Sequence, residues 1–335
     1  MGTVEKEKPT KTIGIGSGMK VLNLKAARFI FTMTVQEPMI LPPYKGSTFR
    51  GGFGNAFRRI ACSRRRRDCN GCLLTAACPY WLLFEPGPPT GAEILKKFEE
   101  IPRPFVIEPD ETEKTEFQPG EVLNLNLVLI GKALDYLPYF ILAFKELGEI
   151  GIGKGRAGYR LDRVTSTPLQ EKKETITVYD GEKVYPHYHV ATPDGIRETL
   201  PGKTCDILKI DFRTMTRLKA GGIFVEKPEF SVLVRVLFRR LSLLQYFYCD
   251  ERMSIDFNAA IERAQNVSLH ADTTSWVDWE RYSSRQNTWM KLGGLVGRAE
   301  YEGPWHEFAE LLRWGELVHV GKGATFGLGR YELAW

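Results

Sequence analysis

The sequence predicts an α+β protein in which one order of elements (strand, helix, strand, strand, helix, strand) occurs twice. Two observations carry this prediction. Stretches that alternate with period two are interleaved with stretches of helical spacing in the same order in both halves. A glycine-rich loop at residues 151–158 links an apolar helical stretch to a strand, and a second loop at residues 321–329 does the same. We therefore expect two tandem ferredoxin-like (RRM-like) βαββαβ domains.

The N-terminal copy is expected at residues 21–165, after a flexible tail at residues 1–20, and carries a cysteine-rich insert at residues 62–80. Phe29, Phe31 and Met33 alternate with polar or smaller residues and predict a first strand at 26–35. Further strands are expected at 105–108, 122–130 and 159–164, and a second helix at 134–147.

The first helix of this copy is expected after Ser47, whose side chain can cap it. Phenylalanine and isoleucine recur after Ser47 at helical spacing and predict one buried face. Gly51, Gly52 and Gly54 lie inside the same helix, where each costs up to about 1 kcal/mol. We expect these glycines to permit close approach of another element or of a ligand.

The C-terminal copy is expected at residues 166–335, and the charged linker at 165–174 marks the boundary between the copies. After extra strands at 175–179 and near Val190, the sequence predicts strands at 205–212, 276–282, 291–300 and 331–335. A long helix that opens with proline is expected at 228–248, a shorter helix at 256–265 and a last helix at 304–314.

Composition indicates an ordinary globular protein, since 43% of the 335 residues are hydrophobic and 26% are charged. The net charge is only +5, so its distribution is more informative than its sum. From Lys45 to Arg67 there are eight Lys or Arg residues and no Asp or Glu, which favours an anion-binding face. No apolar run is long enough to cross a bilayer, and the first twenty residues lack the apolar core of a signal peptide, so we expect a cytoplasmic protein without membrane contact.

Four of the six cysteines fall within seventeen residues, at Cys62, Cys69, Cys72 and Cys78. In a reducing compartment this spacing favours a metal over disulfides, and four thiolates are typical of structural zinc. Pro79 directly follows the last cysteine, which leaves an iron–sulfur cluster as the alternative. Reduced thiols packed in a core are the third interpretation.

Both glycine-rich loops carry cations, Lys154 and Arg156 in the first and Lys322 and Arg330 in the second. Glycines give the backbone freedom to take positive φ and let another backbone come close, and the cations suit a polyanion. Neither loop matches the Walker pattern, which argues against an enzyme of nucleotide metabolism.

The duplicated pattern and both loops resemble the CRISPR-associated endoribonucleases of the RAMP superfamily that process precursor CRISPR RNA, the Cas-six family. The resemblance rests on residues 41–54, 68–72, 78–80, 279–286, 293–297 and the terminal loop. It implies binding of a CRISPR repeat and a metal-independent cut by a ribose 2′-hydroxyl, giving guide RNA for an interference complex whose other subunits are candidate partners. The alternative is a non-cleaving RAMP-type subunit that binds RNA in a CRISPR ribonucleoprotein complex.

Such a cut needs a base, a proton donor and cations for the phosphorane charge. His319 stands immediately before the terminal loop and is the candidate base, with Tyr44 as acid and Lys45 as charge stabiliser. Relatives often read Gly-His-Ala where this chain has Gly54-Asn55-Ala56, and asparagine cannot exchange a proton near neutral pH. Asn55 therefore favours the non-cleaving alternative.

RNA affinity is expected from cations that meet phosphates, from the Trp279 to Tyr282 block and from the terminal glycines. Phe326 is a further candidate for base stacking. The expected RNA-binding residues are Arg50, Arg58, Lys154, Arg156, Arg281, Tyr282, Arg285, Gly321, Lys322, Gly323, Gly327 and Gly329. The remaining histidines are expected outside the site: His306 in packing, His187 and His189 on one strand face, and His270 in a polar loop.

Overall fold

The computed structural model describes residues 22–64, 69, 71–87, 101–169, 174–202, 205–283 and 287–335. The tail expected at residues 1–20 and the candidate Arg285 lie outside these residues, as does most of the arginine run at 64–67. Within the described part of the chain, no helix is both long and apolar enough to span a bilayer.

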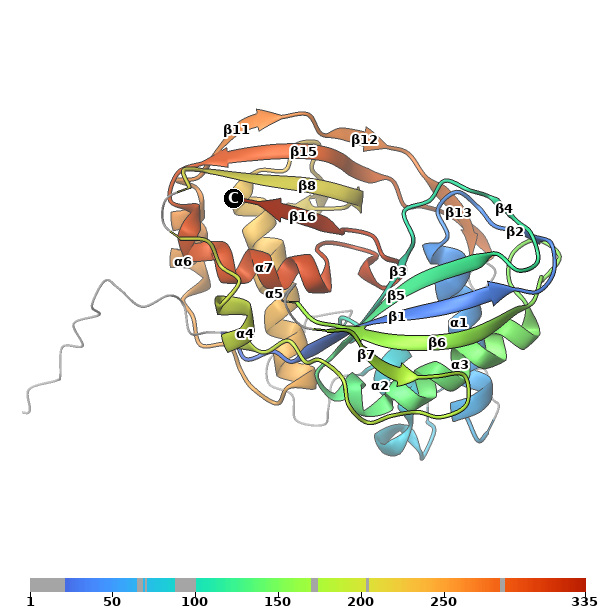
Figure 1. Ribbon diagram of the computed structural model, residues 1–335. Coiled ribbons are helices and arrows are strands. Elements are labelled where there is room, and N and C mark those ends of the chain that lie inside the picture. Colours follow the sequence, from blue (N-terminus) through green and yellow to red (C-terminus); the bar gives the residue numbers. More distant parts are fainter. Residues whose placement is uncertain are drawn as a thin grey trace, which may run out of the picture.

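The N-terminal sheet has the strand order β3 (Phe105–Pro109), β5 (Val122–Ile130), β1 (Ala26–Val35), β6 (Tyr159–Thr167) and β7 (Ile176–Tyr179), and each neighbouring pair is antiparallel. Without β7 this is the ferredoxin-like order, in which the first strand lies between the third and the fourth. Helices α1 (Gly46–Ala61) and α3 (Leu137–Ile150) cover one face (Figure 1). The smaller elements are β2 (Met39–Ile40), η1 (Thr75–Ala77), α2 (Pro79–Phe84), β4 (Glu116–Phe117) and η2 (Gly131–Tyr136).

An aromatic core joins α1 to α3 beneath this sheet. Phe53 of α1 stacks on Phe140 and Phe144 of α3, with ring centroids 5.1 and 4.9 Å apart. Gly52 lets the two helices approach, because a Cβ there would lie 2.6 Å from the side chain of Leu147. A Cβ on Gly51 would meet no atom of the described residues within 4 Å, so among these residues the close approach expected of the helix glycines is made at Gly52 and not at Gly51.

The C-terminal sheet repeats the topology, with the order β11 (Ser268–Asp272), β15 (Gly294–Glu302), β8 (Ile207–Thr216) and β16 (Tyr331–Ala334); β12 (Ser275–Val277) also pairs with β15. Helices α5 (Phe230–Tyr248) and α7 (Ala309–Val318) pack on it. The other elements are α4 (Pro193–Arg197), α6 (Phe257–Ala264), η3 (Trp305–Phe308), η4 (Ala324–Phe326), the β9–β10 hairpin (Lys219–Ala220, Ile223–Phe224) and the β13–β14 hairpin (Glu280–Ser283, Thr288–Lys291).

The two units share a hydrophobic core. Val106, Val128 and Ile130 of the first sheet are buried in the same cluster as Leu237 and Leu241 of α5. Figure 1 shows α5 and α7 beneath the second sheet, on the side that faces the first. Packed elements of both units therefore meet where the two units contact each other.

Several boundaries differ from the sequence-based expectation. The expected domain boundary at residue 165 lies inside β6, and β7 still belongs to the first sheet. Helix α1 already begins at Gly46 with Lys45 as N-cap, so Ser47 lies inside the helix and does not cap it. The strand expected at 276–282 is divided between β12 and β13, and β11 was not expected, so His270 lies in a strand rather than in a loop.

Candidate functional site at the terminal glycine-rich loop

The terminal loop, defined here as residues 319–330, lies between α1 and β3 of the first unit and β8 of the second. The Tyr44 hydroxyl donates a hydrogen bond of 2.6 Å to the carbonyl oxygen of Phe326. From the other side, the Thr214 hydroxyl donates to the carbonyl oxygen of Gly327 at 2.8 Å and accepts from the N–H of Arg330 at 2.9 Å. The loop is thus held by side chains from both units.

Glycine is required where the loop meets α1 and β3. A Cβ on Gly46 would lie 2.0 Å from the carbonyl oxygen of Phe326. Gly327 has a φ of +81°, and a Cβ there would lie 2.6 Å from the carbonyl oxygen of Ile107. The backbone that approaches these glycines closely belongs to the protein itself, so part of the glycine pattern serves to bring the two units together.

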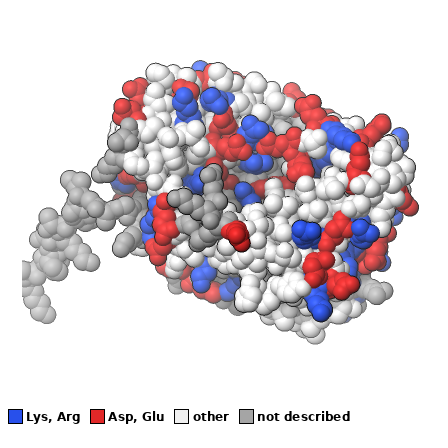
Figure 2. All heavy atoms as spheres, in the orientation of Figure 1, with Lys and Arg blue, Asp and Glu red and all other residues white. Residues whose placement is uncertain are grey.

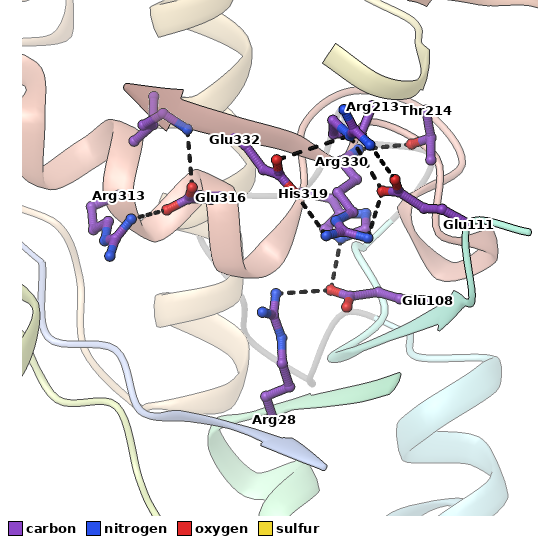
Figure 3. A network of polar contacts seen from close by, with 11 residues as sticks. Arg28, Glu108, Glu111, Arg213, Thr214, Arg313, Glu316, His319, Arg330 and Glu332 are labelled. Atoms are coloured by element: carbon purple, nitrogen blue, oxygen red, sulfur yellow. Dashed lines mark hydrogen bonds and ion pairs between the residues drawn. The ribbon is translucent and has the colours of Figure 1, made fainter. Parts of the chain in front are cut away.

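His319 is completely buried at the start of the loop. Its Nε2 lies 2.9 Å from Oε1 of Glu108 (Figure 3). Its Nδ1 lies 3.1 Å from the carbonyl oxygen of Leu328. Both neighbours are acceptors, and both ring nitrogens are engaged inside the protein. His319 therefore offers no atom to a substrate, and the structure gives it a structural role in place of the catalytic role expected from the sequence.

Glu108 is the centre of a buried polar network between the units (Figure 3). The guanidinium of Arg28 lies 3.2 Å from Oε1 of Glu108, the same carboxylate oxygen that His319 contacts. Burial by itself would raise the pKa of Glu108, but Arg28, His319 and Arg330 together outweigh burial and lower it to about 2. Glu108 is therefore ionised at every physiological pH.

A second set of ion pairs continues this network to the surface. Glu111 accepts from Arg213 of β8 and from Arg330, whose Nη1 lies 2.7 Å from its carboxylate. Arg330 also pairs with Glu332 at 2.9 Å. The cation of Arg330, which the sequence suggested for binding a polyanion, is thus neutralised by protein carboxylates.

Tyr44 is half-buried, and its ring packs edge-on against Trp279 with centroids 5.0 Å apart. Burial, and secondarily the charge of Glu108, raises the pKa of Tyr44, so the phenol stays protonated. Its hydrogen is already donated to Phe326. The geometry therefore shows Tyr44 positioning the loop, and its expected role as acid requires that this bond be exchanged for one to the substrate.

Lys45 is buried, with 1% of its surface exposed. Its ammonium donates to the carbonyl oxygens of Pro43 and Thr112, at 3.1 and 2.7 Å. Burial lowers the pKa of Lys45, partly offset by Asp110. Because the ammonium lies inside the protein, the expected role of Lys45 as a charge stabiliser at the phosphate does not fit this geometry.

Two arginines from different units converge on the ring of Phe326. The guanidinium carbon of Arg50, on α1, lies 5.3 Å from the ring centroid, and that of Arg281, on β13, lies 4.6 Å from it. Both arginines are half-buried, and burial lowers the pKa of Arg281. The sequence suggested each arginine as an RNA contact but not their common position on the terminal loop.

The other expected RNA contacts are dispersed. Lys154 and Arg156 are exposed on the first glycine loop, which packs on β2 through a bond from the N–H of Lys154 to the carbonyl oxygen of Ile40. Arg58 lies over the ring of Tyr80, near the cysteine insert. Lys322 is exposed on the terminal loop. Gly321, Gly323 and Gly329 all have positive φ within that loop, and the side chain of Tyr282 lies outside the described residues.

Charge is mixed on the face drawn in Figure 2, where Lys and Arg are interspersed with Asp and Glu. This agrees with the small net charge of +5. RNA affinity on this face would depend on individual cations rather than on one large basic patch.

The four cysteines of the insert are half-buried free thiols. Burial raises the pKa of Cys69, and Cys62 and Cys78 add to the increase, so these three thiols lie in one neighbourhood. Even so, the described residues contain no group of three or more His, Cys, Asp or Glu side chains that could hold a metal ion. In this arrangement the thiols do not fit a closed zinc site.

The remaining histidines are engaged elsewhere. His306 stacks on Trp305 at 3.8 Å, and His270 pairs with Glu302 at 3.3 Å. His189 bonds through Nε2 to the carbonyl oxygen of Glu174, and His187 is exposed.

The comparisons with known proteins agree with this architecture. One family model, described as an N-terminal domain, matches residues 24–191, and the model of the CRISPR-associated endoribonuclease Cas6 matches residues 210–331. The C-terminal unit of the chain thus matches the Cas6 family. An uncharacterized protein of Archaeoglobus fulgidus is 27% identical over 299 residues, which cover 88% of this chain and 92% of that protein.

Solved Cas6 structures share the fold of this chain at low sequence identity. Thermus thermophilus Cas6 is 14% identical with a TM-score of 0.53, over 93% of this chain and 99% of that chain. A Cas6 product complex is 15% identical with a TM-score of 0.54, over 92% and 100%. A partial Cas6-RT-Cas1–Cas2 complex is 12% identical with a TM-score of 0.56, over 95% of this chain and 47% of that chain. These likenesses support the tandem ferredoxin-like fold expected from the sequence.

Proposed function

We propose that this protein binds the repeat of precursor CRISPR RNA and cuts it by attack of a ribose 2′-hydroxyl on the adjacent phosphate. The product is a guide RNA for an interference complex, whose other subunits are its expected protein partners. The observation that carries the proposal is the convergence of Arg50 and Arg281 on Phe326 of the terminal loop.

The two guanidiniums have the chemistry that the reaction needs. Attack by the 2′-hydroxyl builds negative charge on the non-bridging oxygens of a phosphorane, and preorganised cations stabilise that charge. Arginine remains charged and can bind phosphate oxygens with two parallel hydrogen bonds. Because Arg50 comes from the first unit and Arg281 from the second, a phosphate held by both would lie between the units.

This chemistry assigns no role to a histidine base. His319 is enclosed by Glu108 and Leu328, and Asn55 is exposed on α1 at the position where relatives often carry histidine. The cut therefore depends on orientation of the 2′-hydroxyl and on charge stabilisation, without a resident metal.

The test is incubation of the purified chain with repeat RNA of its own locus in EDTA. We expect one cut, with a cyclic phosphate on one product and a 5′-hydroxyl on the other, and no cut when the 2′-hydroxyl at that position is replaced by hydrogen. Arg281→Gln should lower the cleavage rate by about 10²- to 10³-fold, whereas Arg263→Gln, on α6 and paired with Glu307, should leave it unchanged.

The second candidate is a non-cleaving subunit that binds CRISPR RNA. The enclosure of His319 and the occupied hydroxyl of Tyr44 favour it, since both expected proton carriers are engaged within the protein. Tight, salt-sensitive binding of the repeat with no product in EDTA or in magnesium would select this function over cleavage.

Zinc in the cysteine insert remains a separate proposal, supported by the Cys-x-x-Cys spacing and by the proximity of Cys62, Cys69 and Cys78. Binding would require the thiols to move closer than they lie here. An iron–sulfur cluster is the alternative occupant. Neither takes part in the proposed cut.

A further inference from the structure

A second group of aromatic and cationic side chains lies beside the terminal loop, outside the site described above. It consists of Arg217, Lys219 and Phe224, at the end of β8 and on the β9–β10 hairpin, together with Trp276 of β12. The guanidinium carbon of Arg217 lies 4.4 Å from the Phe224 ring centroid, and the ammonium of Lys219 lies 4.5 Å from it. Phe224 and Trp276 are in ring contact, with centroids 6.1 Å apart.

We propose that these four residues form a stacking platform for unpaired nucleotides of RNA. Trp276 supplies the ring on which a base stacks, Phe224 holds the two cations in place, and Arg217 and Lys219 meet phosphates or a second base. The inference rests on the proposed RNA-binding function and extends it to a particular RNA segment, a single strand beside the site.

Exposure supports this assignment. Tryptophan is a highly buried residue on average, yet Trp276 is 38% exposed. Its indole N–H donates to Asp278 at 3.0 Å, which fixes the orientation of the ring while its surface remains accessible. Exposed rings fixed in one orientation and flanked by cations are typical of surfaces that bind single-stranded nucleic acid.

Arg217 supplies an independent observation. Its Nε is buried and has no hydrogen-bond partner among the described residues, and burial lowers the pKa of its guanidinium. A buried donor without a partner costs free energy, so the guanidinium of Arg217 is not fully satisfied within the protein. A phosphate or a base edge is an acceptor of the right charge and chemistry.

The platform is continuous with the site. The carbonyl oxygen of Arg217 accepts from the N–H of Lys322 at 3.3 Å, so the platform adjoins the terminal loop. Three residues after Trp276, Trp279 contacts Tyr44. The three residues from Trp276 to Trp279 span about 10 Å of extended chain. A few nucleotides of single-stranded RNA span a similar length. Nucleotides next to the scissile phosphate could therefore reach the platform without a duplex.

The test measures binding of the full chain to an unstructured ten-nucleotide RNA and to the same RNA with abasic sites. Trp276→Ala should weaken binding roughly 5- to 100-fold, and Trp276→Phe should retain most of it. With the abasic RNA the two variants and the wild type should bind alike. Lys219→Gln should reduce the slope of log K against log salt by about 0.7 for each lost phosphate contact.

Tyr139→Ala is the matched control, because Tyr139 on α3 is also 38% exposed but carries no cation over its ring among the described residues. Circular dichroism would verify that each variant folds, and Arg217→Gln gives a second variant should Trp276→Ala not fold. Equal binding by Trp276→Ala, Arg217→Gln and Tyr139→Ala would overturn the platform.

Cleavage of the repeat by the same preparations separates this inference from the proposed function. Wild-type cleavage together with unchanged binding by Trp276→Ala removes the platform and leaves the nuclease. Binding that depends on Trp276 without any cut removes the nuclease and leaves the platform. If the wild type binds neither the ten-nucleotide RNA nor the repeat, the platform and the proposed function are both wrong.

Discussion

His319 Nε2 and Glu108 Oε1 lie 2.9 Å apart although the two residues are separated by 211 positions in the sequence. The bond joins the start of the terminal loop to β3 of the first sheet, and both side chains are buried. Arg28 of β1 completes the arrangement by pairing with the same carboxylate. The terminal loop is therefore fixed electrostatically to the first unit.

The lowered pKa of Glu108 predicts an acid-dependent contribution to stability. The pKa of the Glu108 carboxyl is 4.5 in the unfolded chain and about 2 in the folded protein. Its stabilisation is therefore fully present above about pH 4.5 and is lost as the pH falls toward 2, on the order of 3 kcal/mol in total. Glu108→Gln should lower the free energy of unfolding near pH 7, and the difference from wild type should shrink below pH 4.5.

Denaturant unfolding at pH 7, 5, 4 and 3 measures this difference. Glu332→Gln is the control, because Glu332 likewise forms an ion pair, with Arg330, but is 47% exposed. A difference between Glu108→Gln and wild type that stays constant from pH 7 to 3 would contradict the assignment.

The close contact of Gly46 with Phe326 predicts a large effect of one added methyl group. Gly46→Ala should destabilise the protein by several kcal/mol or displace the terminal loop, because its Cβ would lie 2.0 Å from a carbonyl oxygen. Gly51→Ala in the same helix would meet no atom of the described part of the chain and should instead stabilise by up to about 1 kcal/mol. Thermal unfolding of the two variants checks the pair, and equal effects would show that the loop does not seat against α1.

Tyr44→Phe separates positioning from proton transfer. Removing the hydroxyl leaves the carbonyl of Phe326 without this donor, so we expect a loss of about 1 to 3 kcal/mol in the free energy of unfolding. The cleavage rate should fall by less than about tenfold. A fall of about 10²- to 10⁴-fold with unchanged stability would instead assign Tyr44 as the acid. Tyr136→Phe on η2 is the control for loss of a tyrosine hydroxyl.

The zinc proposal predicts about one metal ion per chain by elemental analysis. Cys72→Ser should lose the metal, whereas Cys205→Ser, outside the insert, should keep it. A chelator should lower the melting temperature of the wild type but not of Cys72→Ser. Visible absorbance with bound iron would identify the cluster alternative, and metal-free protein of undiminished stability would remove both.

Local patterns predicted much of the fold. The strands at 26–35 and 122–130 were predicted to the residue, because each alternates cleanly and is bounded by turns or a change of period. The order of elements then determined the ferredoxin-like topology. Helix α1 was misplaced at its start because its cap is not a side chain, and β11 was missed because its face is polar and exposed.

The candidate site was less accessible to prediction, because it depends on pairings between distant residues. Glu108 is an acid inside an apolar strand, a signal that could have been recognised as needing buried partners. Its partners His319 and Arg28 could not be read from spacing. The same holds for Arg281 and Phe326, which meet only because the β13–β14 hairpin packs on the terminal loop.

The bond from Tyr44 to Phe326 spans 282 positions of the chain. The residues of helix α1 and the first sheet are synthesised long before Phe326. Until Phe326 is added, its carbonyl oxygen cannot occupy the position beside Gly46. A ribosome that has translated only the first unit has produced Arg50 but neither Arg281 nor Phe326. The capacity to hold RNA between the units would consequently arise in one step, when the chain has passed residue 330, and nascent chains would not compete with finished protein for repeats.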